Sequence, residues 1–216
     1  NSLANLLDRI EKGDPCILLG TQMLAKGHHF PNITLVAILD ADTGLFSADF
    51  RGQEHMAQTI TQVAGRAGRA ERAGEVIIQS RHSSHITLQT LVRASYAELA
   101  ELLFAEREAS GMPPFSHLCL IRAEAIEVND PISYLKQVAV IAKRLCAEHA
   151  LAVTCLGPLP APMEKRAGRY RIQLLLNSKN RGAIQNLLEQ LTPAISALKH
   201  SRKLRWSIDV DPQDLI

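Results

Sequence analysis

The chain has 216 residues, of which 46% are hydrophobic and 21% charged, and its formal net charge is +2. This length and composition predict a globular protein with one large domain or two small ones. The sequence has no run of about 18 apolar residues and no N-terminal secretory signal. These features argue against a membrane-spanning or exported protein, and we expect a cytoplasmic one.

The first part of the chain predicts alternating helices and strands. Apolar residues recur at three- and four-residue intervals up to Ile10, which indicates a helix. Strands are expected at Cys16–Leu19, Ile33–Leu39 and Glu75–Gln79, and a further helix at Ala57–Arg69. Such alternation is typical of a parallel α/β sheet. Three strands make a thin sheet, so we expect only part of a domain of this class.

A helical pattern follows from His85 to Glu108, and Gly111–Pro114 then breaks it. A proline pair forces extended backbone, so this is the strongest domain boundary in the sequence.

The remainder predicts the order βαββαβ. The expected elements are strand Ser116–Ile126, helix Pro131–His149, strands Ala152–Leu156 and Tyr170–Leu176, helix Asn180–Leu198 and strand Leu204–Val210. This order suits a ferredoxin-like sandwich with both helices on one face of an antiparallel sheet. Pro193 is expected to kink or restart the second helix, with Thr192 as its N-cap.

Charge is distributed unevenly along the chain. Between Ala161 and Trp206 there are ten lysines and arginines against two glutamates, whereas the rest of the chain is net acidic. This asymmetry indicates a local contact with a polyanion. A solvated basic face is the alternative.

The run Gln62-Val63-Ala64-Gly65-Arg66-Ala67-Gly68-Arg69 carries the strongest chemical signal. If the run is helical, Arg66 and Arg69 lie on one face, where two guanidinium groups can converge on a polyphosphate. A guanidinium group aimed at a γ-phosphate stabilises the charge of phosphoryl transfer. The alternative is a pair of surface arginines beside packing glycines.

This octet resembles motif VI of superfamily 2 helicases, and further runs resemble one family of them, the PriA-type primosomal DNA helicases. Gly20–Asn32, reading GTQMLAKGHHFPN, is similar to motif V of that family. The stretch from Leu39 to Arg51 and the junction Met112–Phe115 are similar as well. The resemblance implies a partial RecA-like helicase lobe at residues 1–84, a helical connector at 85–112 and a C-terminal DNA- and partner-binding domain at 113–216.

The resemblance also implies roles for individual residues. Gln62, Arg66 and Arg69 would approach ATP as catalytic residues, and Gly27 and Gly65 would neighbour the nucleotide. Thr21, Gln22 and Lys26 would contact DNA. The complete protein would use ATP and Mg²⁺ to move 3′-to-5′ along single-stranded DNA at stalled or branched replication forks and to promote primosome assembly.

Several chemical sites are missing from the sequence. No Gly-x-x-x-x-Gly-Lys-Ser/Thr phosphate loop is present, so the 216-residue chain alone is not expected to hydrolyse ATP. No metal site is expected, because the four cysteines form no Cys-x-x-Cys pair and no third ligand is spaced to join His28 and His29. Zinc occurs in the resembled family on an upstream cysteine-rich insertion that this sequence lacks.

A second candidate DNA contact is Lys165-Arg166-Ala167-Gly168-Arg169-Tyr170-Arg171. Cations for phosphates and an aromatic ring for base stacking suit a single-strand contact. A hairpin whose charged edge discourages aggregation is the alternative.

Partner binding is expected on the second helix of the C-terminal domain. PriA-like proteins bind the acidic C-terminal tail of the single-stranded DNA-binding protein. Arg181 and Gln185, one turn apart near a helix N-terminus, could bind its carboxylates, with Ile184 and Leu188 walling a pocket. Ordinary polarity beside a core stripe is the alternative. Other primosome proteins and the replicative helicase loader are further expected partners, with a nucleoid-associated location in the cytoplasm.

Two interpretations compete with the helicase. One is a non-enzymatic DNA- and protein-binding module in which the lobe remnant is scaffold. The other is a superfamily 2 translocase acting on RNA, which the residues of motif V disfavour.

Overall fold

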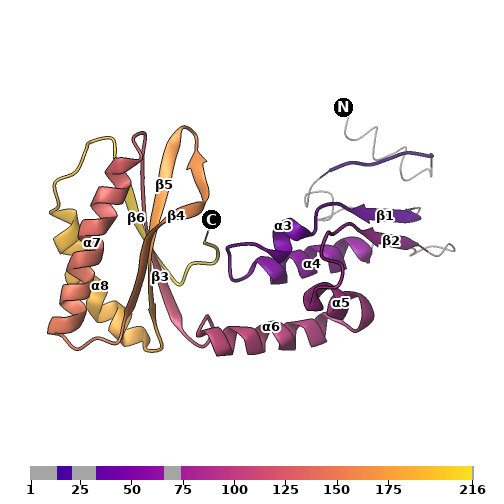
Figure 1. The fold of residues 1–216 in the computed structure, drawn as a ribbon, viewed down its shortest axis with the longest axis horizontal. Coiled ribbons are helices and arrows are strands. Elements are labelled where there is room, and N and C mark those ends of the chain that lie inside the picture. Colours follow the sequence, from indigo (N-terminus) through magenta and orange to yellow (C-terminus); the bar gives the residue numbers. More distant parts are fainter. Residues whose placement is uncertain (1–13, 21–32, 66–73, 216) are drawn as a thin grey trace. The chain divides into compact units, whose positions relative to one another are not determined.

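The computed structural model describes residues 14–20, 33–65 and 74–215, drawn as coloured ribbon in Figure 1. The chain divides into two compact units. The N-terminal unit comprises residues 1–47 and 51–103, and the C-terminal unit comprises residues 48–50 and 104–216.

The N-terminal unit contains a parallel pair of strands, β1 (Leu35–Ile38) and β2 (Glu75–Ile78). This confirms two predicted strands and their parallel pairing. The strand predicted at Cys16–Leu19 is wrong, because the described residues 14–20 form neither helix nor strand. A strand requires backbone partners and a covered face, whereas Ile17 is 98% exposed.

Helices α3 (Asp42–Leu45) and α4 (Gly52–Ala64) pack closely through two glycines. A Cβ atom on Gly44 would lie 2.6 Å from the Met56 Cβ, and one on Gly52 would overlap the Ser47 Cβ. Helix α4 begins five residues before the predicted start. It ends at Ala64 with Gly65 as its C-cap, and the rest of the predicted helix, up to Arg69, lies outside the described residues.

The helical pattern predicted from His85 to Glu108 forms two helices, α5 (Ile86–Arg93) and α6 (Tyr96–Ser110). Ser95 caps α6, since its Oγ accepts from the Glu98 N–H at 3.2 Å and donates to the Glu98 carboxylate at 3.3 Å. This N-cap separates the helices, and the Ser-x-x-Glu pattern that accompanies it is visible in the sequence. The predicted break after α6 is confirmed at Gly111, whose φ is 61°.

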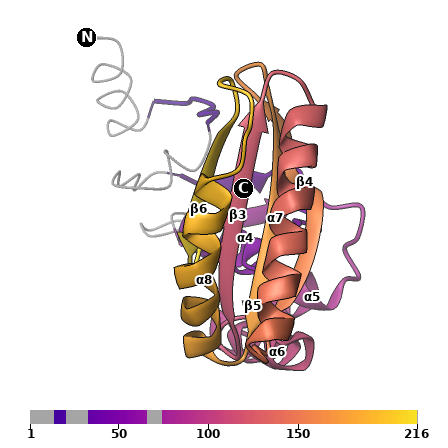
Figure 2. The same cartoon turned by 90° about the vertical axis from the view of Figure 1, so that its left-hand side faces the viewer.

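The C-terminal unit has the predicted βαββαβ order. Its elements are β3 (His117–Ala125), α7 (Asn129–Glu148), β4 (Thr154–Arg166), β5 (Arg169–Ser178), α8 (Arg181–Ser196) and β6 (Arg205–Val210). The strands form an antiparallel sheet in the order β4-β5-β3-β6. Helices α7 and α8 cover one face of this sheet (Figures 1 and 2). The ferredoxin-like prediction is confirmed.

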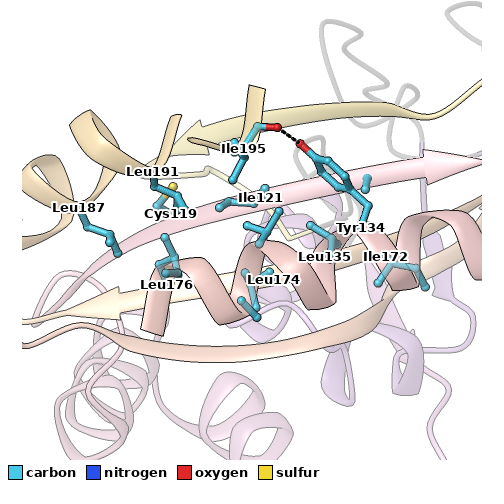
Figure 3. Packing of buried hydrophobic residues seen from close by; sticks show 14 of the residues in the cluster. Cys119, Ile121, Tyr134, Leu135, Ile172, Leu174, Leu176, Leu187, Leu191 and Ile195 are labelled. Carbon is cyan, nitrogen blue, oxygen red and sulfur yellow. Dashed lines mark hydrogen bonds between the residues drawn. The ribbon is translucent and has the colours of Figure 1, made fainter. Parts of the chain in front are cut away.

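The core of this unit lies between the sheet and the two helices (Figure 3). Alternate residues of β3 and β5 point into it, among them Ile121 and Leu174, and they meet Leu135 of α7 and Leu187 of α8. The buried Tyr134 hydroxyl donates to the Ile195 carbonyl at 3.2 Å, which ties α7 to α8.

Two local features differ from the prediction. Strand β4 runs ten residues beyond its predicted end, through Pro158, Pro160 and Pro162. Proline cannot donate a ladder hydrogen bond, but β4 lies at the sheet edge, where one side of the strand needs no donor. Helix α8 continues through Pro193, so the predicted restart with Thr192 as N-cap is wrong. Its N-cap is Asn180, whose Oδ1 accepts from the Gly182 N–H at 2.8 Å.

The cysteines occupy very different environments. Cys16 is exposed, Cys119 is buried, and Cys146 and Cys155 are partly buried. Burial raises the pKa of Cys119 to about 12 and that of Cys155 to about 11. Within the part of the chain that is described, no helix has the length and apolarity needed to cross a bilayer.

Candidate nucleic-acid interface

Most of the predicted nucleotide and motif V residues lie outside the described residues. These are Thr21, Gln22, Lys26, Gly27, Arg66 and Arg69, together with His28 and His29. The structure places Gln62 on the exposed side of the last turn of α4 and Gly65 directly after it. These two residues are therefore at the C-terminal end of a helix packed beside β1.

The acidic residues that follow β1 stabilise a turn. Asp42 accepts from the Ser80 hydroxyl at 2.5 Å and from the Arg81 backbone N–H at 2.9 Å. Hydrogen bonds from Ser80 and then from Arg81 lower the pKa of the Asp42 carboxyl below its usual value. Asp40 accepts from the Thr43 hydroxyl at 2.6 Å. The Asp42 carboxylate thus joins the segments that follow the two parallel strands.

The basic run from Lys165 to Arg171 forms the tip of the β4–β5 hairpin. Ala167 and Gly168 occupy the two turn positions with φ of 49° and 78°. Two positive φ values indicate a type I′ turn, whose twist matches that of the flanking strands. Arg166 and Arg169 face each other across this turn, and Arg166 is exposed.

The structure separates the predicted DNA contacts between two faces of the hairpin. Lys165 is paired with Tyr170, and its Nζ lies 4.5 Å from the centre of the ring, so one aromatic face already holds a cation. Arg169 and Arg171 belong to the opposite face. Arg169 Nη1 donates to the Lys203 carbonyl at 2.8 Å. These two arginines belong to the face of the sheet that α7 and α8 leave uncovered, called here the open face.

Sequence reasoning missed two charged residues of the open face, Arg122 and Glu124 of β3. In the pairing of β3 with its neighbours, Glu124 stands between Arg171 and Arg205. Its carboxylate lies 3.9 Å from Arg169 Nε and 3.9 Å from Arg205 Nη1. The signal was present in the sequence, because charges at alternate positions of an otherwise apolar strand mark one face of a sheet.

Trp206 has a structural role. It packs against the core cluster, and its ring stacks 6.3 Å from that of Tyr134. Its neighbour Arg205 belongs to the open face, so β6 places a cation on that face while the aromatic ring packs on the core.

Arg181 and Gln185, the predicted partner-binding residues, are both exposed on the first turns of α8. Arg181 Nη2 lies 4.0 Å from the Asp211 carboxylate. Ile184 is only 1% exposed and belongs to the core, so the expectation that it walls an open pocket is wrong. The helical repeat places Ile184 inward and its polar neighbours outward.

In residues 14–20, 33–65 and 74–215, no three His, Cys, Asp or Glu side chains are grouped as metal ligands.

Known families match both units. The family described as Primosomal protein N C-terminal domain matches residues 107–213, and the Helicase conserved C-terminal domain matches residues 3–71.

Curated relatives match almost the whole chain. Replication restart protein PriA of Haemophilus influenzae is 43% identical over 99% of this chain, which covers 28% of that protein. PriA of Bacillus subtilis is 35% identical over 96% of this chain, which covers 25% of that protein. PriA of Synechocystis is 38% identical over 79% of this chain, which covers 20% of that protein. The chain thus spans about a quarter of the length of these relatives.

Similarity to solved structures is weak. The designed protein Foldit4 matches 45% of this chain, and 98% of its own, at a TM-score of 0.34 and 14% identity. This likeness indicates nothing about function. The family matches and the nearly complete coverage by PriA sequences agree: this chain belongs to the PriA family and corresponds to its C-terminal portion.

Proposed function

We propose that the complete protein is an ATP-dependent superfamily 2 DNA helicase that moves 3′-to-5′ and acts at stalled or branched forks in replication restart and primosome assembly. The similarity to Replication restart protein PriA over 99% of the chain carries this proposal. ATP and Mg²⁺ would be bound by the complete protein, which would be cytoplasmic and nucleoid-associated. Other primosome proteins and the helicase loader would be its partners.

Arg69 provides the test of the enzymatic part, because its guanidinium group is proposed to act on the γ-phosphate of ATP as an arginine finger. In the complete protein, Arg69→Ala should lower DNA-stimulated ATPase by at least about 10³, because the finger stabilises the γ-phosphate during transfer. Fork binding, measured by fluorescence anisotropy, should change little, since Arg69 acts on the nucleotide. Normal turnover in the variant would refute the role of the arginine.

The alternative is a non-enzymatic DNA- and protein-binding module. The self-contained core of the C-terminal unit favours it for the 216-residue chain, which we expect not to hydrolyse ATP. Absence of DNA-stimulated ATPase activity in the complete protein would refute the helicase proposal and leave the binding module as the remaining function.

DNA binding by the C-terminal unit rests on the basic hairpin. Replacing Arg166, Arg169 and Arg171 together by Gln should weaken single-strand binding and reduce the salt slope by about 0.7 for each phosphate that the chain no longer neutralises. The measurement is affinity between low and moderate salt. An unchanged slope would leave only a solvated basic face.

The acidic tail of the single-stranded DNA-binding protein is proposed to contact Arg181 and Gln185. Asp211 competes for the same guanidinium group at 4.0 Å, so the tail must displace a partly exposed ion pair. Titration of a labelled tail peptide should show a loss of more than about 1.5 kcal/mol for Arg181→Glu. Equal affinities would place the tail elsewhere.

A further inference from the structure

A cavity of 180 Å³ opens on the open face of the C-terminal sheet. Its charged lining comes from Arg122 and Glu124 of β3, Arg171 of β5 and Arg205 of β6. Rigid strands position all four side chains, and cross-strand pairing sets Glu124 beside Arg171 and Arg205. The cavity is therefore a preformed feature of the sheet.

Polar atoms in this region lack partners. Arg171 Nη1 and Arg122 Nε are buried and have no hydrogen-bond partner. The other two nitrogens of Arg122 are held by the Asp209 carboxylate at 2.8 Å and the Asp214 carbonyl at 3.1 Å, which fixes the direction of its free Nε–H. Buried donors are normally satisfied, so two free guanidinium N–H groups indicate a missing acceptor.

The charge balance favours an anionic acceptor. Arg122 is neutralised by Asp209, and Arg169 and Arg205 share Glu124. Arg171 makes no ion pair within the described part of the chain, although it stands directly opposite Glu124 in the sheet. The cavity thus contains an uncompensated guanidinium group.

Gln173, opposite Arg122 on the same face, has a buried Oε1 without a partner. Rotation of this amide exchanges its oxygen for an NH₂ group with two donors. Gln173 can therefore add a donor beside Arg122 when an anion is present.

We propose that this cavity binds one backbone phosphate of a nucleic-acid strand through Arg171, Arg122 and Arg205. The inference rests on the proposed DNA binding by the C-terminal unit and specifies where a phosphate is held. The Arg205 side chain is 71% exposed and approaches Glu124 no closer than 3.9 Å, so it can move toward the anion.

Two observations favour a strand over a free nucleotide. The cavity of 180 Å³ is smaller than the roughly 300–1,000 Å³ of sites that enclose small molecules. Cations also continue away from it: Arg169 is bonded to the Lys203 carbonyl, and exposed Arg166 lies opposite Arg169 at the hairpin tip. A strand along this line would place successive phosphates near successive cations.

The test uses the 216-residue chain and a labelled single-stranded oligothymidine. Arg171→Gln should weaken binding about tenfold and reduce the salt slope by about 0.7, the value for one single-strand phosphate contact. Glu124→Gln should act in the opposite direction and tighten binding, because it removes the one carboxylate that lines the cavity. Thermal unfolding of each variant establishes that the fold is retained.

Lys179→Gln is the matched control, because Lys179 is an exposed cation beyond the other end of β5 and its replacement changes the net charge equally. If Arg171→Gln and Lys179→Gln weakened binding equally, the cavity would not be a phosphate site, although the proposed DNA binding by the C-terminal unit would stand. No binding by the unaltered chain would instead remove the proposed DNA binding itself. Thermal stabilisation by inorganic phosphate without oligothymidine binding would indicate a site for free anions and would also overturn the proposal.

Discussion

The strands of the two units are buried very differently. In the C-terminal unit, Leu118, Cys119, Leu120 and Ile121 of β3 are fully buried in succession, so both faces of this central strand are covered there. In the N-terminal unit, Leu35 of β1 is 54% exposed and Ile77 of β2 is 48% exposed. Parallel strands are normally covered on both faces.

This difference indicates where each unit can support chemistry. The open face of the C-terminal sheet carries charged side chains on strands whose other face is locked by a continuous core. The described candidates of the N-terminal unit, Gln62 and Gly65, lie at the end of a helix held by a smaller cluster around Leu45, Met56 and Ile60. We therefore expect the C-terminal unit to be the more stable of the two.

The largest effect is expected from Leu187→Ala, which removes a fully buried side chain from the C-terminal core. The free energy of unfolding of this unit should fall by about 2–5 kcal/mol. Trp206 is the only tryptophan and packs on this core, so its fluorescence during urea denaturation reports on this unit. Leu88→Ala, in the core of the N-terminal unit, should leave the Trp206 transition unchanged. Equal shifts would mean that the two units unfold together.

Tyr134→Phe should lower the stability of the C-terminal unit by about 0.5–1.5 kcal/mol, because the hydrogen bond that ties α7 to α8 is lost while the Ile195 carbonyl still accepts from the Leu198 N–H at 3.2 Å. The same urea titration measures the change. Phe preserves the ring that packs on Trp206, so the variant isolates the hydroxyl group. Unchanged stability would show that the Leu198 N–H alone satisfies the carbonyl.

Ala167→Asn should stabilise the β4–β5 hairpin by about 0.5 kcal/mol, because Asn tolerates a left-handed conformation better than Ala. Gly168→Ala should act in the opposite direction at the neighbouring turn position, where φ is 78°. Exchange of backbone amide hydrogens in residues 163–172 distinguishes the two variants. Slower exchange in both would contradict the assigned turn.

The smallest effect concerns pH and the N-terminal unit. The pKa of the Asp42 carboxyl is lowered in the folded chain, so its hydrogen bonds stabilise the fold at pH values above the usual pKa of 3.8. That contribution disappears as pH falls through the lowered pKa. Asp42→Asn should remove this part of the pH dependence, measured as amide exchange of residues 80–82 between about pH 5 and 3. An unchanged pH profile would show that the two hydrogen bonds contribute little.

The sequence predicted the elements of the C-terminal unit well because strand alternation and helix periodicity there reflect a complete core. The prediction from sequence failed where the position of a segment in the fold determines its local structure. The edge position of β4 permits prolines that interrupt the strand pattern, and the exposed place of Pro193 near the end of α8 permits it inside a helix.

The candidate site was predicted only in part for a similar reason. The basic hairpin was visible as a local run of charges. Arg122 and Glu124 are distant in sequence from Arg171 and Arg205, and only the pairing of β3 with β5 and β6 brings them together. No property of the hairpin residues alone indicates that Arg171 borders a cavity.

The unequal environments of the cysteines make the chain suited to site-selective fluorescence spectroscopy. Thiolates attack maleimide dyes, and burial suppresses thiolate formation at Cys119 and Cys155 by raising their pKa values. Burial raises the pKa of Cys146 as well, whereas Cys16 is exposed. A dye should therefore react first at Cys16, in the N-terminal unit, without prior removal of any cysteine. Paired with Trp206 in the C-terminal unit, it would provide two optical probes in one unmodified sequence, one for each unit.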